Sequence, residues 1–175
     1  MKAFMDKEFM LQSPTAQHLY HDYAADMPIC DYHCHIPPRE IYENRRFENI
    51  AQVWLGGRNP DGSYFGDHYK WRVMRSNGVP EEYITGDKPD RERFQKFAEA
   101  LPMAIGNPMY HWTNLELHVF FGYDGVLNGD TAEEVWNLCN GKLQHDDSRT
   151  VRGLIEQSNA AFIGTTDDPI DDLAW

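Results

Sequence analysis

Two histidines stand two residues apart at the end of a short apolar run, in the stretch ICDYHCHIPP at positions 29–38. In an extended strand residues i and i+2 point to the same side, so His33 and His35 are predicted to project together, with Asp31 on that side as well. Neutral imidazole is a common ligand of zinc and similar cations. Because proline cannot donate to a strand ladder, the two prolines end the strand just beyond the pair. The spacing indicates a paired metal ligand, and the alternative is two histidines held by ordinary hydrogen bonds.

A helix is predicted to lead into this strand, and a second strand is predicted late in the chain. Ser13 and Pro14 fit an N-cap followed by proline at the first helical position, and apolar residues then recur at helical spacing until Pro28. The second strand is the short apolar run AAFIGT at 160–165. Between the strands, helix starts are predicted at Arg39, Asn49, Asp67, Asp87 with Pro89, Asn107, a capping box at 131–134, and Ser148.

Two short strands among so many helices do not make a conventional two-layer domain. A buried strand needs neighbours, so the strands are expected to join a parallel sheet or barrel, with the helices between them as a large insertion. We interpret the chain as the first part of a larger α/β protein and as a single incomplete domain. Residues 1–38 hold the leading helix and the first strand, 39–158 the helical insertion, and 159–175 the second strand and the start of a helix.

The composition indicates a globular protein and argues against several kinds of partner. The sequence has 175 residues, 41% hydrophobic and 13% aromatic, which is enough for one sizeable core. Its 28 acidic and 16 basic residues give a net charge of -12, which argues against a general surface for nucleic acid or anionic membranes. Three cysteines without paired spacing suggest a reducing compartment, and no run approaches the ~20 apolar residues of a membrane span. With no signal-peptide pattern at the N-terminus, a cytoplasmic protein is expected.

Five blocks of sequence, in order and at matching spacing, resemble the N-terminal part of the uronate isomerase (glucuronate isomerase) family of the amidohydrolase superfamily. The blocks are DYHCHIPP, DHYKWR, MRSNGV, GNPMYHWTNLEL and GTTDDPIDDL, and they span most of the chain. The resemblance implies a metal-dependent (β/α)8 TIM barrel with a helical insertion after its first strand, in agreement with the order of elements above. It also implies that well over half of the enzyme lies outside this sequence.

For the two histidines, the resemblance implies the ligand pair of a single divalent metal, usually zinc. Active sites of such barrels lie at the carboxyl ends of the strands, which is where His33 and His35 stand. The third protein ligand is, by resemblance, an aspartate on the last barrel strand, beyond Trp175. Catalytic zinc typically has about three protein ligands, so two imidazoles leave the site incomplete. Asp31 is expected to orient neighbouring groups rather than to bind the metal.

The block DHYKWR supplies candidate contacts to a substrate. His68, Arg72 and Arg75 share one helical stripe, and Tyr69 lies on the adjacent one. The resemblance implies that His68 and Tyr69 contact the substrate, with Tyr69 as the candidate for proton transfer. A uronate carries a carboxylate and hydroxyl groups, which call for a cation such as Arg72 and for hydrogen-bonding groups. The alternative is that the arginines form a solvated helix face and that Tyr69 only packs.

Two acidic residues follow the second strand. Asp168 before Pro169 fits the N-cap of a further helix, because a carboxylate satisfies free amides and complements the helix dipole. Asp167 is expected either to lie at the rim of the site or to orient other side chains of the site.

Together these features predict an aldose–ketose isomerase that interconverts D-glucuronate with D-fructuronate, and D-galacturonate with D-tagaturonate. The reaction moves a proton between C2 and C1, with one divalent metal, zinc by resemblance, to stabilise the developing charge. The alternatives are a metal-dependent hydrolase of the same superfamily and a non-catalytic fragment or binding module. The expected partner is a hexuronate sugar, and neither nucleic acid nor a membrane is expected as a partner. Whether the protein forms a homo-oligomer is left open. The 175-residue piece alone is expected to be inactive.

Overall fold

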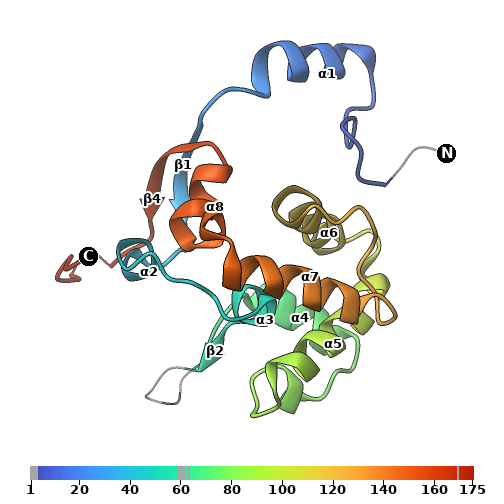
Figure 1. The fold of residues 1–175 in the computed structure, drawn as a ribbon, viewed down its shortest axis with the longest axis vertical. Helices are drawn as coiled ribbons and strands as arrows, with labels where there is room; N and C mark the ends of the chain where they lie inside the picture. The colour runs from blue at the N-terminus through green and yellow to red at the C-terminus, as the bar shows by residue number, and fades with distance from the viewer. Residues whose placement is uncertain (1–3, 59–61, 63, 169) are drawn as a thin grey trace. The chain divides into compact units, whose positions relative to one another are not determined.

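The computed structural model describes residues 4–58, 62, 64–168 and 170–175, and the chain divides into two compact units (Figure 1). The strand-bearing unit combines Met1–Arg46 with Asp147–Trp175, and the helical unit is Phe47–Asp146. The helical unit therefore lies inside the predicted insertion 39–158, and both ends of that insertion belong to the strand-bearing unit.

The strand-bearing unit holds a parallel pair of strands, β1 (Ile29–Cys34) and β4 (Ala160–Thr165). Ile29 is paired with Ala160 and Cys34 with Thr165, with irregular steps between them. Both predicted strands and their parallel pairing are thus confirmed. Because the strands run in the same direction, their carboxyl ends lie at the same edge, and the residues that follow each strand come together there.

Short helices accompany this pair of strands. They are α1 (Pro14–Leu19), the π-helical turn η1 (Tyr20–Ala24), α2 (Pro38–Tyr42), the 3-10 turn η4 (Asp147–Arg149) and α8 (Val151–Gln157). The predicted cap at Ser13 is confirmed, because its hydroxyl accepts from the amide of Ala16 at 3.1 Å. The predicted start at Ser148 is wrong: the cap of α8 is Thr150, which accepts from the amide of Gly153 at 3.3 Å, while Ser148 lies in η4.

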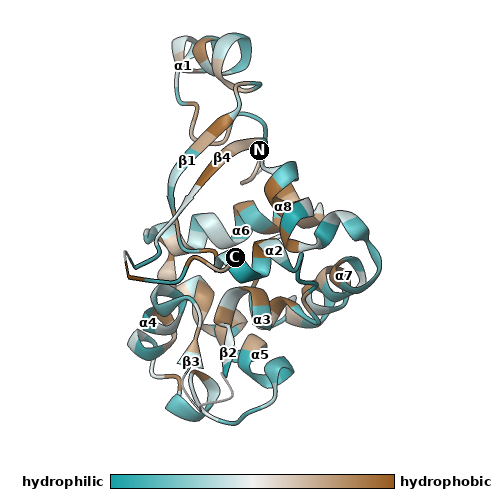
Figure 2. Cartoon of the chain, turned by 90° about the vertical axis from the view of Figure 1, so that its left-hand side faces the viewer, coloured by the Kyte–Doolittle hydropathy of each residue, from teal (hydrophilic) through white to brown (hydrophobic). Residues whose placement is uncertain are grey.

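Apolar side chains stand exposed on both strands. Tyr32 of β1 is 85% exposed, and Ile29 and Phe162 are about half exposed. Figure 2 shows part of each of the two strands in the colour of hydrophobic residues. Parallel sheets are ordinarily covered on both faces. These side chains are therefore what is expected of two strands that belong to a larger sheet.

The segment after β4 differs from the expected helix at 168–175. Pro169 lies outside the described residues, and 170–175 form a turn and irregular backbone. The carboxylate of Asp168 accepts from the amide of Ile170 at 3.0 Å, and that of Asp171 accepts from the amide of Asp168 at 3.0 Å. Asp168 therefore makes the amide contact predicted of a cap, and Asp171 bonds back to it, but no helix follows at 170–175.

The helical unit consists of short and medium helices. They are α3 (Ile50–Leu55), α4 (His68–Ser76), η2 (Glu81–Tyr83), α5 (Asp90–Ala100), η3 (Leu101–Ala104), α6 (Pro108–Phe121) and α7 (Ala132–His145). Within the part of the chain that the structure describes, none of the helices has both the length and the apolar character needed to cross a membrane.

After α3, two short strands, β2 (Gly57–Arg58) and β3 (Tyr64–Phe65), form an antiparallel pair. Gly56 ends α3 with a φ of 67°, and a Cβ atom there would lie 1.8 Å from the carbonyl oxygen of Phe65. Only glycine tolerates both the left-handed backbone and the close approach of β3. Gly56 therefore ends α3 and lets β3 approach its backbone.

The core of the helical unit forms around α5. Four apolar residues, spaced along one face of α5 and into η3, are fully buried: Phe94, Phe97, Ala98 and Leu101. They join one cluster with apolar side chains of α3, α4, α6 and α7, among them Trp54, Met74, Leu117 and Val135. Helices this short gain most of their stability from such packing of one apolar face.

Helix starts in this unit show which local signals are reliable. The predicted caps at Asn49 and Asn107 are confirmed, with the amides of Gln52 and Met109 donating at 3.0 and 2.9 Å. The capping box at Thr131 is wrong, because its hydroxyl donates to the carbonyl of Val126 at 2.9 Å and makes no cap bond.

The start predicted at Asp87 is also displaced. Helix α5 begins at Asp90, and the carboxylate of Asp87 instead accepts from the guanidinium of Arg58 at 3.0 Å. A partner from a distant part of the chain has replaced the local amide in this case.

Candidate functional site

The histidine pair stands at the carboxyl end of β1, with His33 in the strand and His35 just beyond it. The ring centroids are 5.0 Å apart and the ring planes are nearly perpendicular, at 83°. Both residues are exposed. The two imidazoles therefore project together, as the spacing of i and i+2 predicts, and both can be reached by a ligand.

One nitrogen of His35 is held by a residue from the neighbouring strand end. The hydroxyl of Thr166, which directly follows β4, lies 3.2 Å from Nδ1 of His35. When Nδ1 donates its proton to this oxygen, the tautomer is fixed and the lone pair on Nε2 is left for a metal. The parallel pairing of β1 and β4 thus supplies the orienting partner that metal-binding histidines generally have.

The two aspartates predicted near the pair bond to local groups. A carboxylate oxygen of Asp31 accepts from the backbone amide of His33 at 3.3 Å. The carboxylate of Asp167 accepts a short hydrogen bond from the hydroxyl of Thr165. Both carboxylates therefore bond to groups at the strand ends.

The donor set at this edge fits part of a metal site. His33 and His35 offer two neutral nitrogen donors, which suit zinc and similar divalent cations. Over residues 4–58, 62, 64–168 and 170–175, no three His, Cys, Asp or Glu side chains are grouped so as to hold a metal. A metal at the pair would therefore need at least one more ligand beyond those described.

The second candidate group lies at the start of α4, in the helical unit. Asp67 caps the helix, accepting from the amide of Tyr69 at 2.8 Å and from that of Lys70 at 3.4 Å. This confirms the predicted cap. His68 and Tyr69, the first two residues of the helix, are both exposed, and their ring centroids are 4.3 Å apart. The cap therefore sets the backbone on which both candidate substrate contacts stand.

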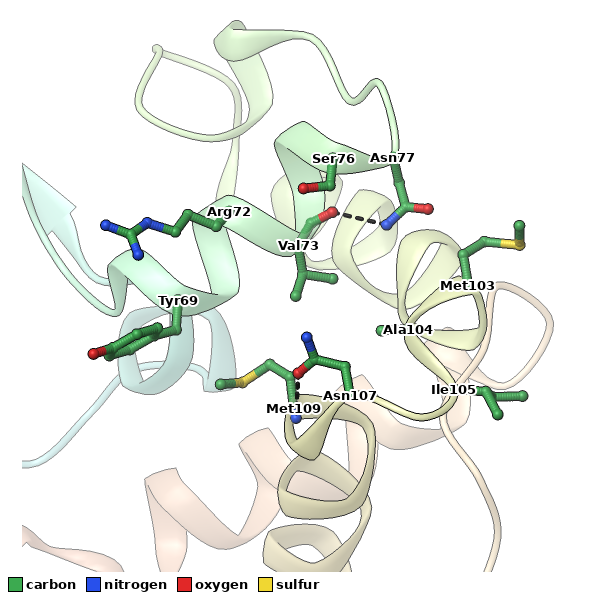
Figure 3. Close-up of a pocket in the computed structure, with 10 residues that line it drawn as sticks. All are labelled: Tyr69, Arg72, Val73, Ser76, Asn77, Met103, Ala104, Ile105, Asn107 and Met109. Atoms are coloured by element: carbon green, nitrogen blue, oxygen red, sulfur yellow. Dashed lines mark hydrogen bonds between the residues drawn. The ribbon is translucent and has the colours of Figure 1, made fainter.

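Tyr69 and Arg72 line one cavity of about 320 Å³ (Figure 3). Its walls come from one side of α4, from η3 and the residue after it, and from the start of α6. The guanidinium of Arg72 lies 5.6 Å from the centroid of the Tyr69 ring, at cation–π distance. His68 is not among the lining residues. The cavity thus brings together a phenol and a cation, two of the three predicted substrate contacts.

Asn107 is a lining residue that sequence reasoning treated only as a helix cap. Its amide oxygen accepts from the amide of Met109, and Figure 3 shows its amide nitrogen on the side of Val73, toward the cavity. An amide nitrogen is a donor for a hydroxyl or carboxylate oxygen. The N-cap signal at Asn107 could not reveal this second role, because it depends on the position of α4.

The other arginine of the predicted stripe has a different partner. Arg75 donates to Glu81 from Nε at 2.8 Å and from Nη2 at 2.5 Å. These hydrogen bonds, with one from Thr85, lower the pKa of the Glu81 carboxyl to about 2. Arg75 therefore belongs to a surface ion pair, and Arg72 is the arginine of the stripe that lines the cavity.

Comparison with known proteins gives a consistent result over the whole chain. The family model described as Glucuronate isomerase matches residues 1–175. Among curated proteins, the chain is 69% identical over 175 residues to the uronate isomerase of Lachnospira eligens and 51% identical to that of Bacillus subtilis. In both cases the match covers 100% of this chain and 35% of the relative, so the chain spans about a third of their length.

Solved structures agree with the fold. The chain is similar to the crystal structure of a uronate isomerase from Thermotoga maritima, with a TM-score of 0.87 and 33% identity, over 99% of this chain and 36% of that one. It is also similar to a glucuronate isomerase from Caulobacter crescentus, with a TM-score of 0.80 over 98% of this chain and 36% of that chain. At 23% identity the second likeness is evidence for the fold alone.

Proposed function

The chain belongs to the glucuronate isomerase family, and from that premise we propose that the whole protein interconverts D-glucuronate with D-fructuronate, and D-galacturonate with D-tagaturonate. The observation that carries the proposal is the family match over all 175 residues, supported by the identity of 69% to a curated uronate isomerase. The histidine pair at the end of β1 and the Tyr69–Arg72 cavity supply residue types that this reaction needs.

We propose that His33 and His35 hold one divalent metal, with zinc expected. The support is the 5.0 Å separation of the two rings and the contact between Thr166 and Nδ1 of His35. When bound, such a cation polarises a sugar oxygen and stabilises negative charge on it. A further ligand is expected from a later part of the protein, an aspartate by resemblance.

The substrate is proposed to be a hexuronate in its open-chain form. Arg72 can pair with the carboxylate, since a guanidinium matches a carboxylate with two parallel hydrogen bonds. Hydroxyl oxygens of the sugar can be bound by the phenol of Tyr69 and the imidazole of His68, which are neighbours on the first turn of α4.

The reaction moves one proton from C2 to C1 and one from O2 to O1, and it leaves the overall oxidation state of the sugar unchanged. A base removes the proton from C2, and the electron pair of that C–H bond forms the C1–C2 double bond of an enediolate, whose negative charge lies first on O1. O1 then takes up a proton, O2 gives one up, and a proton delivered to C1 gives the ketose. Tyr69 is proposed to hold or deliver a proton at a sugar oxygen during these steps. The base that removes the proton from C2 is expected outside the described residues.

The wider architecture is proposed on the same basis. β1 and β4 would be the first two strands of a (β/α)8 barrel, in one domain with the insertion 39–158 between them. Their parallel pairing and exposed apolar side chains support this arrangement. A hexuronate is proposed as the small-molecule partner, and the cytoplasm as the location. The oligomeric state is left open.

The test is product analysis with the full-length protein. Purified enzyme is incubated separately with D-glucuronate and with D-galacturonate, and the products are identified by NMR. The proposal expects the corresponding ketose from at least one substrate. Absence of ketose from both, together with hydrolysis of amide or ester substrates, would favour the alternative of a metal-dependent hydrolase of the same superfamily.

A further inference from the structure

A lysine is buried at the base of the turn that carries the two candidate substrate contacts. Lys70, on α4, is only 5% exposed. Its Nζ atom lies 3.1 Å from Oδ2 of Asp67 and 5.8 Å from the centroid of the Trp54 ring on α3. Lysine is rarely buried unless it is paired, because an isolated ammonium loses its hydration. The pairing with Asp67 and the aromatic face are therefore what keep this cation inside the helical unit.

A second carboxylate faces the same lysine from another helix. Glu116 on α6 is partly buried and receives a hydrogen bond from the side chain of Trp54. Burial raises the pKa of Glu116, and the positive charge of Lys70 opposes that shift. Two carboxylates therefore interact with Lys70, Asp67 from its own turn and Glu116 from α6, and Trp54 of α3 lies against its ammonium.

Asp67 connects this buried group to the backbone of the first turn. Its Oδ1 atom accepts from the amide of Tyr69 at 2.8 Å, and its Oδ2 atom binds the ammonium of Lys70. One carboxylate is therefore shared between the cap of α4 and a cation that is anchored among α3, α4 and α6. Movement of Lys70 would change the position of the cap.

Tyr69 stands on the turn that Asp67 caps. Its side chain is 55% exposed, and it contacts the ring of His68 and the guanidinium of Arg72, which are exposed residues of the same helix. The backbone of the first turn therefore contributes to where the phenol is placed. We propose that Lys70 is a positioning residue, which through Asp67 fixes the first turn of α4 so that Tyr69 meets the substrate; this inference rests on the proposed isomerase function.

The kinetic test is a double-mutant cycle in the full-length enzyme, with Lys70→Met, Tyr69→Phe and the double variant assayed on D-glucuronate. A misplaced catalytic group typically costs about 10-fold or more in rate, so Lys70→Met should lower kcat by about that factor with KM changed less than about twofold. In the Tyr69→Phe background the same substitution should lower kcat by less than about twofold, because the group that it positions is gone. An equal loss in both backgrounds would show a purely structural role and overturn the proposal.

A matched control and a second variant guard against an effect on folding alone. Lys96→Met removes a lysine that is paired three residues away with Glu99 at 2.8 Å on a partly exposed face of α5, and it should leave kcat unchanged. If Lys70→Met does not fold, Asp67→Asn replaces it, because asparagine retains a capping oxygen but weakens the tie to the ammonium. The same non-additivity with Tyr69→Phe is then expected.

A measurement without substrate separates this proposal from the proposed function. Hydrogen exchange at the amide of Tyr69 should be faster in Lys70→Met than in the wild type, whereas amides in the last turn of α4 should keep their rates. Lys96→Met should change neither. If the wild type forms no ketose, the isomerase proposal fails, but hydrogen exchange still tests whether Lys70 fixes the first turn of α4. An unchanged exchange rate at the Tyr69 amide in Lys70→Met would overturn the proposed role of Lys70.

Discussion

Nδ1 of His35 and the hydroxyl oxygen of Thr166 lie 3.2 Å apart, although 131 positions separate the two residues in the sequence. The contact exists because β1 and β4 are parallel and end at the same edge, so the first residue after β4 reaches the ring that follows β1. It is the observation that gives most support to the proposed metal-binding role of the histidine pair.

Loss of the Thr166 hydroxyl should weaken metal binding in the full-length protein. Because removal of a group that orients a metal-binding histidine typically costs about 10- to 100-fold in affinity, Thr166→Val should raise the dissociation constant for zinc by at least about 10-fold. Titration against a competing chelator measures this. Thr166→Ser, which keeps the hydroxyl, is the control, and equal affinities for the valine variant and the wild type would contradict the orienting role.

The two cavity residues should affect different kinetic parameters. Tyr69→Phe removes a group proposed to act on a proton in the transition state, so kcat and kcat/KM should fall together by about 10²-fold. Arg72→Met removes a contact to the carboxylate in both ground and transition states, so KM should rise and kcat should change little. Steady-state assays on D-glucuronate measure kcat and KM for both variants. An unchanged KM for Arg72→Met would show that another residue binds the substrate carboxylate.

Arg93 should matter for stability far more than its neighbour on α5. It is 5% exposed and donates to the carbonyls of Leu55, Gly56 and Ile84 at 3.0–3.2 Å. Arg93→Met leaves these buried acceptors short of a donor and should lower the free energy of unfolding by about 2–4 kcal/mol.

The control for Arg93 is Arg91→Met, which breaks a solvent-screened pair with Glu133 and should lower the free energy of unfolding far less than Arg93→Met does. Urea unfolding of the full-length protein, followed by a probe in the helical unit, compares the two. Similar losses for both variants would show that the buried hydrogen bonds of Arg93 contribute little.

The Arg75–Glu81 pair predicts a small dependence of stability on pH. The pKa of Glu81 is lowered from 4.5 to about 2, chiefly by its hydrogen bond from Arg75. Because the folded-state pKa is depressed, the stabilisation is fully present above about pH 4.5 and is lost as the pH falls toward 2. The pair is exposed and screened by solvent, so Glu81→Gln should cost less than about 1 kcal/mol at pH 7 and progressively less at lower pH. A cost that grows on acidification would contradict this sign.

Local chemistry explains which features could be predicted from the sequence. The caps at Ser13, Asn49, Asp67 and Asn107 depend on amides two or three residues away, and all four are present. The same reasoning fails at Thr131, where the carbonyl of Val126 competes for the hydroxyl. Side chains with several nearby partners are not assigned correctly from spacing alone.

Features that depend on distant residues could not be predicted. Two carbonyl acceptors of Arg93, Leu55 at the end of α3 and Gly56 just after it, lie 38 and 37 positions away in the sequence, and Lys70 is buried where residues of α3 and α6 lie against it. Both residues have the sequence pattern of ordinary surface cations. The cavity likewise needs η3 and the start of α6 to lie beside α4, so spacing within α4 could suggest Tyr69 and Arg72 but not Asn107.

The most direct test of the central claim is a paired measurement of metal content and ketose formation on the full-length enzyme and its His33→Ala, His35→Ala double variant. If the pair binds the metal of a uronate isomerase, the wild type should contain about one divalent metal per chain and convert D-glucuronate to the ketose, while the double variant should lose both properties. A correctly folded double variant that retains full metal content and full ketose formation would contradict the account.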